Sequence, residues 1–150
     1  MTGRTLFREA PELVTNGNCE LDSNWYGTPI ETPPAITRSE EKVHSGTYSM
    51  KLASTGSNGI RSETFKVALG NTYRFSGWFY TASTTGSIHI YAYNGLSSAF
   101  TVIYPDITPN TWCSFSLNKT MEVGGSNCRI MVYIADSGNL YIDDISVREV

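Results

Sequence analysis

Hydrophobic and polar residues alternate with a period of two along much of this chain, which is the side-chain period of a β-strand. The alternation is clear around Tyr48, Met50 and Leu52, because a polar residue separates each from the next. Comparable segments follow at residues 65–69, 72–80, 87–93, 100–104, 112–117, 128–135 and 140–147. Turn-forming Gly, Asn and Pro residues separate them, and no segment has the period of a helix. The pattern therefore predicts roughly nine or ten short strands.

Short strands at this spacing are typical of all-β domains. We predict a two-sheet antiparallel β-sandwich with the topology of a jelly roll. A chain of 150 residues is long enough for one domain with a sizeable core. We expect residues 1–11 to be a polar lead-in segment and residues 12–150 to form a single β-sandwich domain.

The N-terminal third is less regular than the rest of the chain. Residues 13–14 are expected to begin a short strand that runs into a turn-rich stretch. Residues 22–27 are expected to form a loop that carries two large aromatic side chains, Trp25 and Tyr26. Residues 54–59 are rich in Gly, Ser and Asn, and we interpret them as a flexible loop.

Composition and charge narrow the range of partners. Charged residues make up 17% of the chain, the formal net charge is −3, and Lys and Arg do not cluster, so a nucleic-acid partner is disfavoured. No apolar run is long enough to span a membrane. Residues 1–8 lack the apolar core of a signal peptide. We nevertheless expect an extracellular or virion-associated domain. Either a leader was removed, or the domain was cut from a longer chain, or it leaves its cell by lysis or another route.

Three cysteines, Cys19, Cys113 and Cys128, match no metal-binding spacing. Cys113 and Cys128 each alternate with apolar residues of a predicted strand, so both are expected to face inward. Buried thiols are the favoured state, and a disulfide between Cys113 and Cys128 is the alternative.

The last predicted strand, residues 140–147, contains two adjacent aspartates, Asp143 and Asp144. Apolar residues alternate on both sides of this pair, but the spacing slips by one residue at the pair itself. Such a slip would swap the two faces of the strand unless a β-bulge absorbs it. Adjacent carboxylates are costly to hold together without a cation. From these residues alone, a solvated acidic kink and a cation site remain equal alternatives.

Five segments carry a resemblance to a known family. They are Asn16-Gly17-Asn18-Cys19-Glu20, His44-Ser45-Gly46-Thr47-Tyr48-Ser49-Met50, Leu69-Gly70-Asn71-Thr72-Tyr73-Arg74-Phe75-Ser76-Gly77-Trp78, Thr111-Trp112 and Tyr141-Ile142-Asp143-Asp144-Ile145. In this order they resemble motifs of carbohydrate-binding modules of the family 4, 9, 16 and 22 type, across about residues 12–148. Each motif alone is weak, and Cys19 stands where Phe is usual. Similar domains also occur in phage tail and virion proteins.

The resemblance implies a galactose-binding-like jelly roll with one structural calcium ion. The positions that match the family's ligand set are Asn18, Glu20, the backbone carbonyl of Gly46, and Asp143. Calcium prefers such mixed carboxylate and carbonyl oxygens. Asp144 is adjacent and would share or replace the role of Asp143.

Sugar binding needs flat apolar faces for stacking and planar polar groups that bond hydroxyls. Outward positions of three predicted strands supply such groups, and they would form one surface if the strands share a sheet. The resembling modules often add an aromatic side chain from the loop near residues 25–26. The predicted carbohydrate-binding residues are Trp25, Tyr26, Arg74, Trp78, Tyr80, His89, Tyr91, Tyr93, Arg129 and Tyr133. Each ring alone is also explained by sheet packing, and we assign Trp112 to packing.

Two hypotheses for function follow, and neither is an enzyme. The acidic residues suggest no pair across a cleft, and neither histidine lies in a nucleophile motif. The first hypothesis is a non-catalytic module that binds a polysaccharide or oligosaccharide, within a larger enzyme or virion assembly. The alternative is a structural or adhesion domain of a phage tail, virion or other surface assembly.

Overall fold

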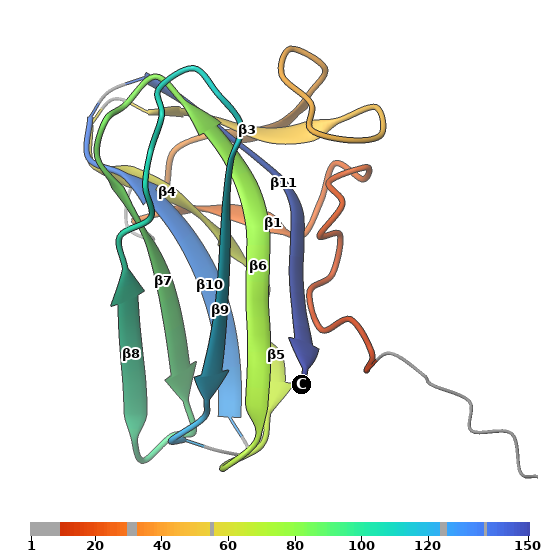
Figure 1. Ribbon diagram of the computed structural model, residues 1–150, viewed down its shortest axis with the longest axis vertical. Helices are drawn as coiled ribbons and strands as arrows, with labels where there is room; N and C mark the ends of the chain where they lie inside the picture. The colour runs from red at the N-terminus through yellow and green to blue at the C-terminus, as the bar shows by residue number, and fades with distance from the viewer. Residues whose placement is uncertain (1–9, 30–32, 55, 124–125, 137) are drawn as a thin grey trace, which may run out of the picture.

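The computed structural model describes residues 10–29, 33–54, 56–123, 126–136 and 138–150. This part of the chain forms eleven β-strands and no helix. The strands make two antiparallel sheets that lie face to face as a sandwich, as Figure 1 shows. The predicted all-β jelly-roll sandwich is therefore confirmed. No helix in the described residues is long and apolar enough to cross a membrane.

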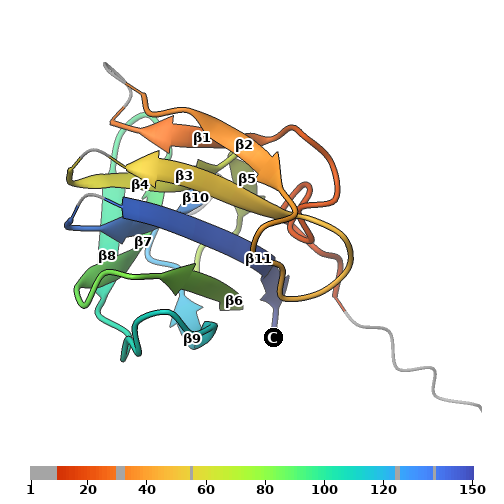
Figure 2. The same ribbon diagram turned by 90° about the horizontal axis from the view of Figure 1, so that it is seen from above.

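Each sheet combines strands that are distant in sequence. The first sheet has the order β1 (Trp25–Thr28), β4 (Asn58–Ser62), β10 (Ser126–Ile134), β7 (Gly86–Tyr93) and β8 (Ser98–Ile103), and β5 (Phe65–Val67) also pairs with β10. The second sheet has the order β2 (Ile36–Ser39), β3 (Ser49–Ser54), β11 (Gly138–Glu149), β6 (Thr72–Thr81) and β9 (Cys113–Thr120). Figure 2, the view from above, shows β2, β3, β11 and β6 following one another in one layer.

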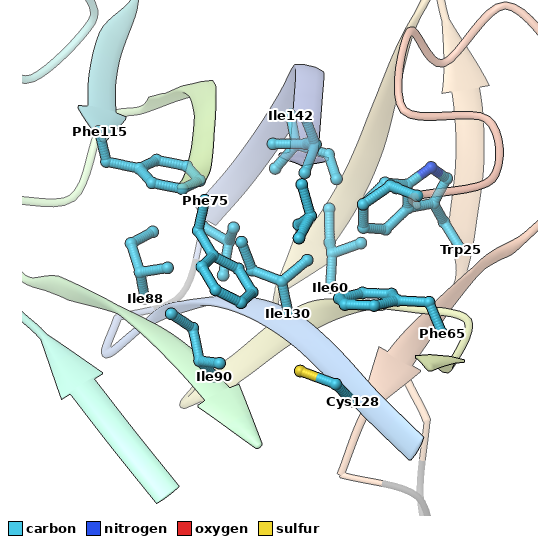
Figure 3. Close-up of a cluster of buried hydrophobic side chains, with 14 of the residues drawn as sticks. Trp25, Ile60, Phe65, Phe75, Ile88, Ile90, Phe115, Cys128, Ile130 and Ile142 are labelled. Atoms are coloured by element: carbon cyan, nitrogen blue, oxygen red, sulfur yellow. The ribbon is translucent and has the colours of Figure 1, made fainter. Parts of the chain in front are cut away.

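The core fills the space between the two sheets. Ile60 and Ile130 project from the first sheet, and Phe75 and Ile142 project from the second, each at most 1% exposed (Figure 3). Apolar and polar residues alternate along these strands, and successive side chains point to opposite faces of a sheet. The apolar residues therefore lie on the inner faces. Burial of such side chains is the main favourable contribution to folding.

The predicted slip in the last strand is a bulge. The pairing of β11 with β6 shifts register between Asp143 and Ser146, and Asp144 has a positive φ of 50°. The bulge lets Ile142 and Ile145 both face the core, where they are 0% and 2% exposed. The faces of β11 therefore keep their apolar and polar character on both sides of the aspartate pair.

The N-terminal segment lies along the bulged strand (Figure 1). The Ile145 amide donates to the Gly17 carbonyl at 2.9 Å, and the Leu13 amide donates to the Val147 carbonyl at 3.0 Å. A Cβ atom on Gly17 would lie 2.0 Å from the Ile145 carbonyl oxygen, so only glycine allows this approach. Cys19 is fully buried nearby. Residues 13–17 are therefore held against β11 by backbone hydrogen bonds, and we call this segment the clasp.

Three local predictions differ from the structure. Residues 13–14 form no strand, although Leu13 bonds to β11. Residues 25–28 form the edge strand β1 rather than a loop, and residues 58–62 form β4, which overlaps the predicted loop at residues 54–59. These short segments are strands because they pair with β4 and β10, respectively, and such pairing is not visible in local sequence.

The cysteines are free thiols. Cys128 faces the core, and its burial raises the pKa of the thiol to about 12. Cys113 is half-buried at the start of β9, so its inward position is only partly as expected. The alternative disulfide between Cys113 and Cys128 does not form.

The contact of Gly17 with β11 gives a stability prediction. Gly17→Ala should lower the free energy of unfolding by about 1–3 kcal/mol, because the added methyl group collides with backbone. Gly56→Ala is the matched control, since a Cβ atom there meets nothing within 4 Å. Urea unfolding of both variants checks this, and equal effects would contradict the clasp.

Candidate functional site

The ten predicted binding residues do not form one surface. β7 and β10 are neighbours, so His89, Tyr91 and Tyr93 share an outer face with Arg129 and Tyr133. Tyr26 joins the same face through β1 and β4. Arg74, Trp78 and Tyr80 lie on β6 in the second sheet, whose outer face points away from the first. The condition that the three strands share a sheet therefore fails for β6.

Trp25 also lies elsewhere. It faces inward from β1, is 6% exposed, and donates from Nε1 to the Asn16 carbonyl at 2.8 Å. Its neighbour Tyr26 faces outward and is 41% exposed. The pair alternates because the segment is a strand and not a loop, and only Tyr26 can meet a ligand on the outer face.

The remaining residues, with two more, form a continuous outer surface on the first sheet. We call it the aromatic face, and it consists of Tyr26, Arg61, His89, Tyr91, Tyr93, Phe100, Arg129 and Tyr133. Sequence reasoning missed Arg61 and Phe100. Arg61 lies in β4, which was not predicted as a strand, and Phe100 lies in β8, whose pairing with β7 places it opposite Tyr91.

Rings on the aromatic face contact one another across three neighbouring strands. The His89 ring centroid lies 4.4 Å from that of Tyr133 and 5.1 Å from that of Phe100. Tyr91 packs edge-on against Phe100 at 6.1 Å. Phe100 remains 56% exposed and Tyr93 46% exposed. An exposed cluster of this kind offers flat apolar surface to a ligand.

A cavity of about 630 Å³ opens at one end of the aromatic face. Its lining includes His89, Phe100 and Tyr133 from the face, together with Tyr104 and Ile107 from the segment after β8. The volume falls within the range of small-molecule sites. The cavity and the ring cluster therefore share residues and form one concave site.

His89 is partly buried in this site, and burial disfavours its charged form. Burial lowers its pKa below the usual value. Ser87 Oγ lies 2.7 Å from His89 Nε2, within hydrogen-bond distance. Positive charge on the aromatic face comes instead from Arg61 and Arg129, whose guanidinium carbons lie 5.1 Å and 5.2 Å from the ring centroids of Tyr26 and Tyr91.

Aromatic residues of the second sheet pack beneath a loop. His44 stacks on Trp78 with centroids 4.0 Å apart and an interplanar angle of 19°. Trp112 contacts His44 and Tyr80 edge-on, in keeping with its predicted packing role. Trp78 and Tyr80 are therefore half-buried by the protein itself.

The predicted metal residues gather around the β11 bulge. Asp143 is fully buried and accepts hydrogen bonds from the His44, Ser45 and Asp144 amides at 2.8–3.1 Å. Burial is the main cause that raises its pKa to about 6, and the neighbouring Asp144 carboxylate adds to the rise. Asp144 Oδ2 lies 2.6 Å from His44 Nδ1.

Glu20 reaches the same turn from the N-terminal segment. Its Oε1 accepts hydrogen bonds from the Thr47 and Tyr48 amides at 3.0 Å and 3.2 Å. A Cβ atom on Gly46 would lie 2.2 Å from Glu20 Oε1, and the φ of Gly46 is +70°, so glycine is required there. Asn18 is exposed beside Glu20 and accepts from its amide.

Three carboxylates of this site lie close enough to the Cys19 thiol to shift its pKa. Burial raises the pKa of Cys19 well above its usual value, and the charges of Asp143, Asp144 and Glu20 raise it further. Within the described ranges, no three acidic, histidine or cysteine side chains converge to hold a metal by themselves. A cation here would need amide and carbonyl oxygens as well.

Comparison with known families identifies the class of domain. The model of the CBM_4_9 family, described as a carbohydrate binding domain, matches residues 11–138. The chain therefore belongs to this family of carbohydrate-binding domains. Among curated protein sequences, none matches the chain.

Solved structures share the fold at low identity. The C-terminal family 22 carbohydrate binding module of Clostridium thermocellum Xyn10B is 18% identical, covers 94% of both chains, and superposes with a TM-score of 0.75. The CBM22-1 xylan-binding domain of Paenibacillus barcinonensis Xyn10C is 13% identical, covers 97% of this chain and 98% of its own, and has a TM-score of 0.74.

A phage protein shares the fold as well. The enzymatically active domain of tailspike protein 4 from bacteriophage CBA120 is 17% identical over 93% of this chain, with a TM-score of 0.73. This chain spans only 21% of that tailspike chain. At these identities the similarity extends to the fold alone.

The buried Asp143 carboxyl gives a pH prediction. Its pKa is about 6 in the folded protein against 3.8 for a free side chain, so the folded state binds this proton more tightly. In metal-free buffer, its contribution to the free energy of unfolding should increase as pH falls from about 7 to about 4.

The difference between wild type and Asp143→Asn isolates this group. Urea unfolding of both proteins across that pH range gives the difference between their free energies of unfolding. This difference should change in favour of wild type as pH falls. A difference that stays constant with pH would contradict the shifted pKa.

Proposed function

We propose that this domain binds a polysaccharide or oligosaccharide non-covalently on the aromatic face, and that it catalyses no reaction. The observation that carries the proposal is the exposed ring cluster of His89, Tyr91, Phe100 and Tyr133, which borders the cavity. Membership of a carbohydrate-binding family supports the ligand class. Sugar rings would stack on the aromatic side chains, and hydroxyls would bond the polar groups between them.

Contacts outside the aromatic face favour a structural role for the other predicted residues. Trp78 is covered by His44, and Tyr80 packs against Trp112 and Tyr141. We therefore assign the ligand to the first sheet alone. Ser45 Oγ donates to Asp144 rather than to His44, so this cluster lacks the serine–histidine contact of a nucleophilic site.

A role as an adhesion domain of a surface assembly is the second candidate. The observation in its favour is the shared fold with the phage tailspike domain. The two candidates are compatible if a surface assembly attaches to glycans through this domain outside the cell. Retention of a polysaccharide by the purified domain supports binding, whereas self-association without glycan retention supports the purely structural role.

Two half-buried tyrosines on opposite sheets allow a matched test. Tyr91→Ala should weaken glycan binding about tenfold to a hundredfold, because it removes a stacking surface at the centre of the aromatic face. Tyr80→Ala should leave affinity unchanged, since Tyr80 lies on the second sheet. Titration calorimetry on the polysaccharide selected from a glycan array measures both. Equal losses of affinity in the two variants would mean that the ligand does not bind on the aromatic face.

We also propose that a structural calcium ion binds at the β11 bulge. Asp143 is buried with no lysine or arginine partner among the described residues, and Asp144 and Glu20 add negative charge nearby. Asn18, Glu20, the Gly46 carbonyl and Asp143 would hold the ion, and mixed oxygens of this kind suit calcium. The ion would neutralise the carboxylates and tie the N-terminal segment and the 44–48 turn to β11.

Calcium should raise the unfolding temperature, and a chelator should lower it. The expected stabilisation is about 2.7 kcal/mol when calcium exceeds its dissociation constant by about a hundredfold. Glu20→Gln should abolish the calcium-dependent part, whereas Glu40→Gln, an exposed residue after β2, should keep it. Thermal unfolding with calcium, magnesium and chelator checks this. No shift with calcium in wild type would disprove the site.

A further inference from the structure

The strands of the first sheet carry an unbalanced charge. They contain three basic side chains, Arg61, Lys66 and Arg129, and no acidic residue. All three lie on the outer side, because Arg61 pairs across from Met131, and Lys66 is exposed opposite Asn127. The chain as a whole has a net charge of −3. The strands that carry the aromatic face therefore have a net positive charge, whereas the chain as a whole is acidic.

Within the residues that the structure describes, neither arginine of the aromatic face forms an ion pair with an acidic side chain. The Nε atoms of Arg61 and Arg129 are buried and make no hydrogen bond. The guanidinium group of Arg61 lies over the ring of Tyr26, and that of Arg129 lies over the ring of Tyr91. A partly buried cation without an anion is costly, and a bound anion would remove that cost.

Glu63, the acidic residue two positions after Arg61, is engaged by other groups. Glu63 follows β4 directly, and the Tyr26 hydroxyl donates to its Oε1 at 2.8 Å. Hydrogen bonds from Asn24 and Tyr26 lower the pKa of Glu63, so it is an anion held by neutral donors. It leaves the guanidinium group of Arg61 without an ion pair.

Basic residues in the strands of the second sheet are arranged differently, since each has an acceptor in the protein. Lys51 pairs with Glu41, Lys119 with Glu122 and Arg148 with Glu12, while Arg38 donates to the Glu20 carbonyl and Arg74 to the Asn118 amide oxygen. The absence of such acceptors at Arg61 and Arg129 is therefore specific to the aromatic face and is not a general property of the chain.

We propose that the aromatic face selects an acidic polysaccharide, whose carboxylate or sulfate groups bond Arg61 and Arg129. This inference rests on the proposed sugar-binding function and specifies the ligand class. Each guanidinium group lies over a tyrosine ring, so a sugar held against the exposed rings of the aromatic face can meet the planar guanidinium fork with its acidic group. Arg61 and Arg129 occupy diagonal positions on neighbouring strands, about 7–8 Å apart along the face, so one chain can reach both.

The test compares acidic and neutral polysaccharides on the intact chain. Polygalacturonate supplies carboxylates, dextran sulfate supplies sulfates, and xylan free of uronic acid groups is the neutral reference. Wild type should bind at least one acidic polymer more tightly than xylan, and this binding should weaken as salt increases. The acidic polymer that binds better identifies the anionic group.

Matched arginine variants localise the effect. Arg129→Gln and Arg61→Gln should each weaken binding to the acidic polymer roughly tenfold to a hundredfold, because each removes charge-assisted hydrogen bonds. Arg74→Gln is the control, since Arg74 is exposed on the second sheet and its removal subtracts the same charge. Circular dichroism and thermal unfolding establish that each variant is folded.

Four outcomes would overturn the proposal. If xylan binds as tightly as the acidic polymers and Arg129→Gln has no effect, the sugar-binding function stands and the acidic ligand is wrong. If Arg74→Gln costs as much as Arg129→Gln, attraction is diffuse and the aromatic face does not select the anion. If no polysaccharide binds, or single-stranded DNA binds more tightly than any of them, the proposed function fails as well.

Discussion

The bulge at Asp143 and Asp144 is the constraint on which the rest of this sandwich depends. It lets β11 keep apolar side chains in the core on both sides of an acidic pair. The buried Asp143 carboxylate accepts hydrogen bonds from backbone amides of the 44–45 turn. The Ile145 amide, directly after the bulge, donates to the Gly17 carbonyl. One irregular point in a central strand thus holds two segments that are distant in sequence.

The two outer faces of the sandwich differ in how their polar and aromatic groups are used. On the second sheet, Trp78 is covered by His44, and basic residues of the strands find acceptors within the protein. On the first sheet, Phe100 and Tyr93 remain exposed, and the Nε atoms of two arginines have no acceptor in the part of the chain that the structure describes. Unsatisfied donors and exposed rings on one surface are features that a ligand would complete. This asymmetry is the reason why we propose ligand recognition on the first sheet and a structural role for the aromatic residues of the second.

Separation of these roles has a physical advantage. The clasp, the bulge and the 44–48 turn all lie on the side of the second sheet and fix its central strand. The first sheet packs on that support through Ile60 and Ile130, which are at most 1% exposed. Ring positions on the aromatic face are therefore set by rigid strands rather than by loops, so a ligand does not have to order them on binding.

The sequence by itself determined the sandwich, the bulge and most inward positions, because strand periodicity and turn residues are local signals. It also placed His89, Tyr91 and Tyr133 on outer faces. Only the tertiary structure decided which outer faces coincide: β6 pairs with β11 and β9, whereas β7 pairs with β10 and β8. Long-range pairing likewise made a strand of Trp25–Thr28 and brought Arg61 beside Tyr26. Sheet order arises from contacts between distant segments, which a period of two cannot encode.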